Sequence, residues 1–178
     1  YFKKLGLQNV DELLNVYHQQ GIFMQQEKGL VTSAEFRDVI RQMVGKPLTD
    51  QQIDDAWNSF LVDIPTYKLD LLLKLREKYV VYLLSNTNDI HWKWSCENVF
   101  PYRGFQVEDY FEKIYLSFEM KMVKPDTEIF ETVLADANID PKETFFIDDS
   151  EANCLAAQAL GISTYTPQAN ENWSHIFN

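Results

Sequence analysis

The 178-residue chain carries a formal net charge of −11 and is 46% hydrophobic, a composition ordinary for a folded protein. The acidic balance, with no run rich in Lys and Arg, argues against a protein that binds nucleic acid or another polyanion. No apolar run reaches the roughly 18 residues of a membrane-spanning helix, and the first residues do not resemble a signal peptide. Cys96 and Cys154 are the only cysteines and have no metal-ligand spacing, so we expect a cytoplasmic protein that binds neither nucleic acid nor membrane.

Helical patterns occupy the N-terminal third of the chain. Apolar residues recur at helical spacing over 10–17. Thr32 with Glu35, and Thr49 with Gln52, form capping-box patterns ahead of two further amphipathic stretches. Because each helix has one apolar stripe that must be buried, the segment is predicted to form a small antiparallel helical bundle.

From residue 66 onward, helical and strand patterns alternate. A helix is predicted over 66–78 and a strand at 79–84, where a continuous apolar run is typical of burial on both faces. The remaining predictions are strands at 113–117, 144–147 and 162–165, an irregular segment at 100–112, and helices after Asn88, after Pro125 and over 151–160. This alternation predicts an α/β fold with a parallel sheet and right-handed crossovers.

Two adjacent carboxylates follow the predicted strand at 144–147. Asp148 and Asp149 repel each other, and each resists ionisation unless a positive charge lies nearby. A divalent cation would supply that charge at the carboxyl end of a strand, where open α/β sheets bind ligands. Alternatively, the acidic residues favour the positive end of the next helix dipole, which suits Glu151 better than Asp148. Both interpretations remain open at this point, and Ser150 is predicted to cap that helix.

Polar groups also lie at two other element ends. Residues 85–88, Ser-Asn-Thr-Asn, offer hydroxyl, amide and backbone N–H donors at a helix start, which suits an anion, although such residues often serve only as caps. Lys124 precedes the helix that follows Pro125, where a cation opposes the dipole unless it shares an anion. The alternative for Lys124 is a solvated surface lysine. Taken together with the carboxylates, these groups could hold a phosphoryl group and Mg²⁺.

The order of these motifs resembles the haloacid dehalogenase superfamily of hydrolases, over essentially the whole chain. Three segments carry the resemblance: LLSNTN at 83–88, Lys124 within MVKPDTEIF, and FFIDDSEAN at 145–153. The helical segment ahead of them is similar to the subgroup with a helical cap. The residues of the first and last segments are similar to those of small sugar-phosphate phosphatases of the α-glucose-1-phosphate phosphatase type.

The resemblance implies a Rossmann-like core with an inserted helical-bundle cap, and Mg²⁺-dependent hydrolysis of a small phosphorylated metabolite, with a sugar phosphate as the expected substrate. It implies that Ser85 and Asn86 bind the transferring phosphate and that Lys124 holds the phosphate and the nucleophile. It also implies that Asp149 ligates Mg²⁺ directly, with Asp148 acting through water or as a partner of the ligands. The domains are expected at 1–64 for the cap and 65–178 for the core.

One family motif is missing. The resemblance implies a first strand ending in Asp-x-Asp, which supplies the nucleophile and the general acid/base, and nothing before residue 10 resembles it. We therefore expect that strand to lie upstream of Tyr1 and the present chain alone to be inactive. Two alternatives remain: hydrolytic dehalogenation of 2-haloacids, against which the Asp148-Asp149 pair argues, and a non-catalytic anion-binding module. The sequence predicts neither the oligomeric state nor the identity of the ester.

Overall fold

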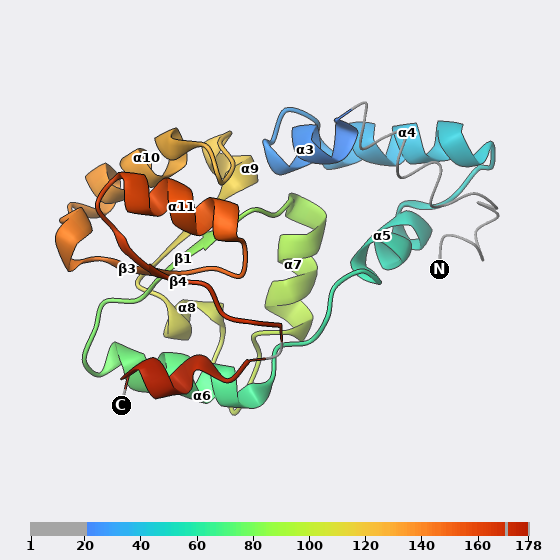
Figure 1. Cartoon of the computed structure of the whole chain (residues 1–178). Helices are drawn as coiled ribbons and strands as arrows, with labels where there is room; N and C mark the ends of the chain where they lie inside the picture. The colour runs from blue at the N-terminus through green and yellow to red at the C-terminus, as the bar shows by residue number, and fades with distance from the viewer. Residues whose placement is uncertain (1–20, 170, 178) are drawn as a thin grey trace. The chain divides into compact units, whose positions relative to one another are not determined.

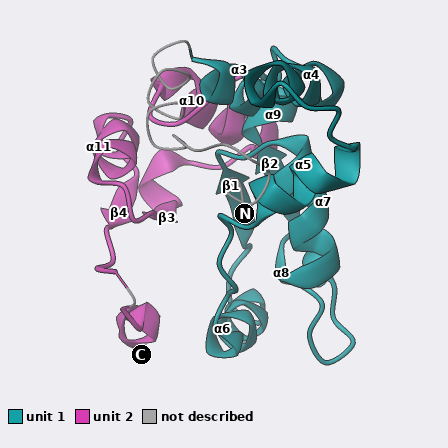
Figure 2. Cartoon of the chain, turned by 90° about the vertical axis from the view of Figure 1, so that its right-hand side faces the viewer, with its two compact units in different colours: residues 1–121 teal, residues 122–178 magenta. Residues whose placement is uncertain are grey.

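The computed structural model describes residues 21–169 and 171–177, and the chain divides into two compact units (Figures 1 and 2). The first unit is Tyr1–Lys121 and the second is Met122–Asn178. The helices before residue 64 share the first unit with later elements, so this division does not test the predicted domain boundary at 64/65, which stays a prediction. The helix predicted over 10–17 lies outside the described residues. No described helix combines the length and apolar character needed to cross a bilayer.

The first unit holds a helical segment followed by a parallel strand pair. Its described elements are α3 (Ile22–Glu27), α4 (Ser33–Val44), α5 (Asp50–Asn58), α6 (Thr66–Arg76), β1 (Tyr82–Ser85), α7 (Asp89–Asn98), α8 (Val107–Tyr110), β2 (Lys113–Leu116) and α9 (Ser117–Met120). Strands β1 and β2 are parallel, with Ser85 paired to Leu116 at their carboxyl ends. Two cores form, one around Phe36, Ile53 and Trp57, the other around Leu69 and Tyr110.

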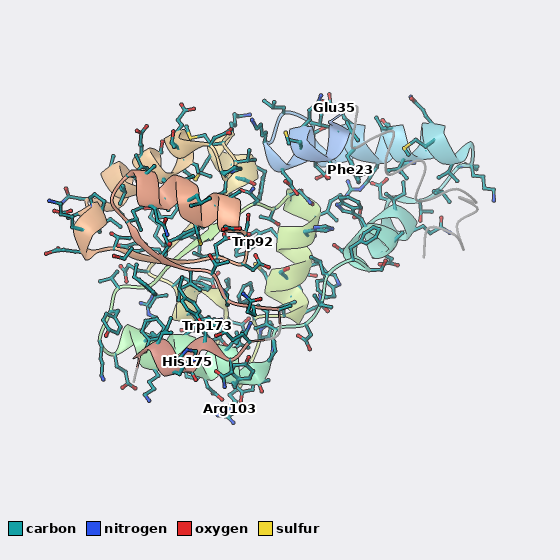
Figure 3. The ribbon with its side chains drawn as sticks, viewed as in Figure 1. Phe23, Glu35, Trp92, Arg103, Trp173 and His175 are labelled. Atoms are coloured by element: carbon teal, nitrogen blue, oxygen red, sulfur yellow. The ribbon has the colours of Figure 1, made fainter. Side chains whose placement is uncertain are left out.

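Both predicted capping boxes are confirmed. The Thr32 side chain accepts from the Glu35 backbone N–H while Glu35 accepts from Thr32, and Thr49 and Gln52 repeat the arrangement at α5. The helices pack through aromatic contacts: the Phe23 ring (Figure 3) stacks on Trp57 with 4.9 Å between centroids. Each cap satisfies N–H groups that the helix start would otherwise leave unpaired, which is why these short sequence patterns predicted the starts correctly.

Three predictions in this unit need correction. The strand expected at 79–84 begins only at Tyr82, because the N–H groups of Lys78 and Tyr79 still bond to the Leu75 carbonyl at the end of α6. Tyr79 is therefore 54% exposed and the strand itself is half-buried. The segment 100–112, expected to be irregular, contains the short helix α8, whose Val107 and Tyr110 are buried.

The second unit holds another parallel strand pair. Its elements are α10 (Thr127–Ala137), the 3₁₀ turn η1 (Pro141–Glu143), β3 (Phe145–Ile147), α11 (Glu151–Ala159), β4 (Ser163–Tyr165) and the 3₁₀ turn η2 (Trp173–Phe177). Strands β3 and β4 pair in parallel and α11 connects them, as the alternating pattern predicted. In β3, Phe145 is 47% exposed and packs against Phe177 of η2, and the other two residues are half-buried.

Candidate active site

A polar loop follows β1 in the first unit and is held by a buried serine. Ser117, fully buried, accepts from the Thr87 backbone N–H at 2.9 Å and donates to the Thr87 carbonyl at 3.0 Å. Asn88, 2% exposed, accepts from the His91 N–H and so caps α7. The loop that follows Ser85 and begins at Asn86 is thus fixed at its far end by two side chains that water hardly reaches.

A buried ion pair lies beyond β3 in the second unit. The Lys124 ammonium is 2.6 Å from Asp148 Oδ2, and each of the two side chains is only 8% exposed. Lys124 Nζ also lies 5.5 Å from the centre of the Phe146 ring. The solvated lysine considered as an alternative is therefore excluded, because a charged side chain is this deeply buried only when it is paired.

The remaining oxygen of Asp148 accepts two further hydrogen bonds. The Ser150 N–H donates to Oδ1 at 2.8 Å and Asn153 Nδ2 donates to it at 2.9 Å. Four groups therefore position one another: Lys124, Asp148, Ser150 and Asn153. The predicted side-chain cap by Ser150 is wrong, since its side chain makes no cap bond and its backbone N–H is instead bound by the preceding carboxylate.

Asp149 lies in a different environment from its neighbour. The residue is exposed, and among the described residues no hydrogen bond or ion pair to its side chain is found. Adjacent residues leaving a strand point in opposite directions, so the chain can bury one carboxylate against Lys124 and present the other to solvent. The pair predicted from sequence thus divides into a fixed carboxylate and an open one.

The donor set at Asp148 and Asp149 fits a hard divalent cation. Mg²⁺ takes oxygen ligands, is held by one or two carboxylates, and draws its other ligands from water and substrate phosphate. Asp149 offers such an oxygen to solvent, whereas both oxygens of Asp148 are already hydrogen-bonded. No group of three or more His, Cys, Asp or Glu side chains suited to a metal occurs within the described ranges. The cation therefore fits at Asp149 provided that further ligands come from other sources.

The structure brings some predicted site residues together within each unit. Lys124 and Asp148 are in contact, and Asp149 is the next residue in the chain. Ser85 ends β1, and Asn86 begins the loop after it. Sequence reasoning missed two residues. Ser117 fixes the loop after β1, and Asn153 fixes the carboxylate of Asp148. An asparagine in the first turn of α11 was the one available signal for Asn153, whereas nothing local to Ser117 indicated that it contacts residue 87, thirty positions earlier.

Comparison with known proteins gives consistent matches. The family model for haloacid dehalogenase-like hydrolases matches residues 101–166. A D-ribitol-5-phosphate phosphatase of Bacteroides thetaiotaomicron is 39% identical over 172 residues, which are 97% of this chain and 84% of that protein.

Solved structures give the same result. A HAD family enzyme from Bacteroides thetaiotaomicron is 73% identical, with a TM-score of 0.96 over 99% of this chain and 87% of that one. The same wild-type enzyme has been crystallised with magnesium and inorganic phosphate, and this complex matches with a TM-score of 0.95. A HAD-like hydrolase from Porphyromonas gingivalis is 37% identical, with a TM-score of 0.88 over 99% of this chain and 84% of that one.

Proposed function

The chain belongs to the haloacid dehalogenase-like hydrolase family, and on that premise we propose that it is a magnesium-dependent phosphatase of small phosphomonoesters. One observation carries the proposal: a lysine with 8% of its side chain exposed is paired to Asp148, and the next residue in the chain, Asp149, is exposed. Burying a lysine costs free energy that a structural role could avoid, and a fixed cation beside an open carboxylate suits a phosphate with its metal.

Each site residue has a proposed task. Ser85 and Asn86 donate hydrogen bonds to the phosphate from the loop that Ser117 and Asn88 fix. Lys124 binds a phosphate oxygen and neutralises its charge, while Asp148 holds the ammonium in place. Because Ser117 and Asn88 fix the loop in the first unit and Asp148 fixes the ammonium in the second, little reorganisation is needed within either unit when charge builds up on the transferring group.

Magnesium is the proposed cofactor, with Asp149 as a direct ligand. When bound, the ion neutralises phosphate charge and orients the ester for attack. Asp148 contributes by holding Lys124 and its own loop, so that Asp149 faces the ion. A wild-type relative with 73% identity crystallises with magnesium and inorganic phosphate, which supports this proposal.

The proposed substrate is a small phosphorylated sugar or polyol. A relative at 39% identity is named a D-ribitol-5-phosphate phosphatase, which makes that ester the first to test. We also propose a cytoplasmic location, supported by the free thiols of Cys96 and Cys154. The protein to assay is the full-length product of the gene.

The test measures phosphate release from D-ribitol 5-phosphate with Mg²⁺, with excess EDTA, and with Mg²⁺ restored. Activity is expected only when Mg²⁺ is present. Asp149→Asn is expected to lower kcat/KM by about 100-fold or more. Loss of a residue that hydrogen-bonds to a metal ligand already lowers activity about 10–100-fold, and loss of the ligand itself should cost at least as much. The matched control is Glu151→Gln, an exposed acid two residues away, which is expected to stay within about twofold of wild type.

Two results would contradict the proposal. Release of halide from a 2-haloacid without Mg²⁺, and no release of phosphate, would favour the dehalogenase alternative. Binding of inorganic phosphate without turnover of any ester would favour a non-catalytic anion-binding module.

A further inference from the structure

Gln26 on α3 is a buried polar side chain. Only 3% of the residue is exposed, and neither its amide nitrogen nor its amide oxygen has a hydrogen-bond partner among the residues that the structure describes. A buried polar atom left unpaired costs about 1–3 kcal/mol. Native proteins contain few such groups, so each one calls for an explanation such as a ligand.

The Gln26 side chain lines a pocket of the first unit. The pocket encloses about 250 Å³ and is bounded by α3, the turn after it, the start of α7 and Phe118 of α9. This volume lies below the roughly 300–1,000 Å³ of sites for drug-sized ligands, so it suits a small metabolite.

Hydrogen-bonding groups without positive charge surround this space. Besides Gln26, the polar lining residues are Thr32, Ser33 and Asp89, and no Lys or Arg is found among the described residues that line it. Ser33 Oγ donates to Asp89 Oδ2 at 2.9 Å, which leaves lone pairs on both groups to accept hydrogen bonds. An acidic wall without a cation repels phosphate, whereas an amide and free acceptors match neutral hydroxyl groups.

The pocket adjoins the end of the loop that follows Ser85. Asp89 follows that loop directly, and Phe118 follows Ser117, which is bonded to the Thr87 backbone. The polar loop therefore ends at the pocket, and Ser85 and Asn86, assigned above to phosphate binding, lie four and three residues before Asp89 in the chain.

We propose that Gln26 is a specificity-determining residue that hydrogen-bonds the hydroxyl groups of a polyol or sugar phosphate in this pocket. The proposal rests on the proposed phosphatase function. The Gln26 amide nitrogen donates to one hydroxyl oxygen, its amide oxygen accepts from a hydroxyl, and Asp89 accepts from another. Binding of a hydroxylated substrate then satisfies the amide that the free protein leaves unpaired, which favours such substrates over apolar esters of the same length.

The experiment compares two substrates of equal chain length, D-ribitol 5-phosphate and n-pentyl phosphate, in the full-length protein with Mg²⁺. Gln26→Leu keeps a side chain of similar size on α3 and removes the amide. It is expected to lower kcat/KM for ribitol phosphate about tenfold, the size of one hydrogen bond, and to leave pentyl phosphate within about twofold. The midpoint of thermal unfolding is expected to stay or rise, since an unpaired buried amide is removed. The control, Gln25→Leu on the exposed side of the same helix, is expected to change neither kcat/KM.

Equal losses on both esters, or no loss on ribitol phosphate, would overturn the assignment of Gln26. A wild-type protein that hydrolyses neither ester would instead contradict the proposed function. In that event, calorimetric titration of Mg²⁺-free protein with D-ribitol 5-phosphate tests whether Gln26 contributes to binding of the ester. Binding about tenfold weaker in Gln26→Leu supports the assignment, and equal binding or none to wild type overturns it.

Discussion

At the scale of single residues, the ion pair of Lys124 and Asp148 dominates the second unit. Its partners lie 2.6 Å apart and almost out of reach of water, and Asp148 gains two more hydrogen bonds from Ser150 and Asn153. Taking two charges out of water is costly, and the attraction between them repays this only when both are present. The pair thus adds little to the free energy of unfolding, but removing one partner lowers that free energy strongly. This is expected of two charged groups that are kept for their function.

This predicts a strong coupling between the two residues. Lys124→Met and Asp148→Asn are each expected to lower the free energy of unfolding by about 3–5 kcal/mol, because each leaves the other group buried without its partner. The double variant is expected to lose less than the sum, with a coupling of about 1–3 kcal/mol. Urea unfolding of the four proteins measures the coupling, and additive losses would show that the pair is not energetically linked.

At the scale of elements, the turn between α3 and α4 fits tightly against α9 within the first unit. Gly29 has a φ of +61°, and a methyl group on it would lie 1.9 Å from the Phe118 carbonyl oxygen. Lys121 Nζ donates to the Gly29 carbonyl at 3.2 Å, and Ser33 donates to Asp89 at the start of α7. Only a residue without a side chain can bring these two backbones so close together.

A matched pair of glycines tests this fit. Gly45, at the end of α4, has a similar φ of +66° but no atom within 4 Å of an added methyl group. Gly45→Ala is expected to cost about 1–2 kcal/mol for the left-handed backbone alone. Gly29→Ala is expected to cost about 1–3 kcal/mol more, because the backbone of Phe118 must also move. Equal changes in unfolding free energy would show that the contact between Gly29 and Phe118 does not form in solution.

Helix α7 packs against α5 through a contact between His91 and Trp57. The His91 ring stacks on Trp57 with 4.9 Å between centroids, and Nε2 lies 3.2 Å from the Trp57 carbonyl oxygen. Burial lowers the pKa of His91 below its usual value of 6.5, and the hydrogen bond to Trp57 opposes this only in part. The folded state therefore favours the neutral ring.

The sign of the pH dependence follows from that shift. Above about pH 6.5 the ring is neutral in both states, and as pH falls below this value the unfolded chain binds the proton first. Stability is therefore lost progressively until the folded pKa is passed. His91→Phe keeps the stacked ring and removes the titration, so it is expected to lose less stability than wild type between about pH 7.5 and 5.5. Urea unfolding at both pH values measures this, and identical losses would contradict it.

At the scale of the whole molecule, the sequence pattern predicted the elements better than it predicted their environments. Capping boxes, the order of helices and strands, and the polar residues at strand ends are local features, and the structure has them. Burial is not local. Lys124 is buried because Asp148, 24 residues later, lies against it. Gln26 is buried because helices distant in sequence pack around it. The strand start at Tyr82 also escaped prediction, because the N–H group of Tyr79, a residue type that favours strands, bonds to the end of α6 instead.

Our central proposal is that Ser85 and Lys124 bind the same phosphate and that Asp149 ligates magnesium. The most direct test is a crystal structure of the full-length protein with Mg²⁺ and inorganic phosphate. We predict that Ser85 Oγ and Lys124 Nζ both lie within hydrogen-bonding distance of the same phosphate, and that a carboxylate oxygen of Asp149 lies about 2.0–2.1 Å from the ion. A phosphate bound without Lys124, or an ion bound away from Asp149, would contradict the claim.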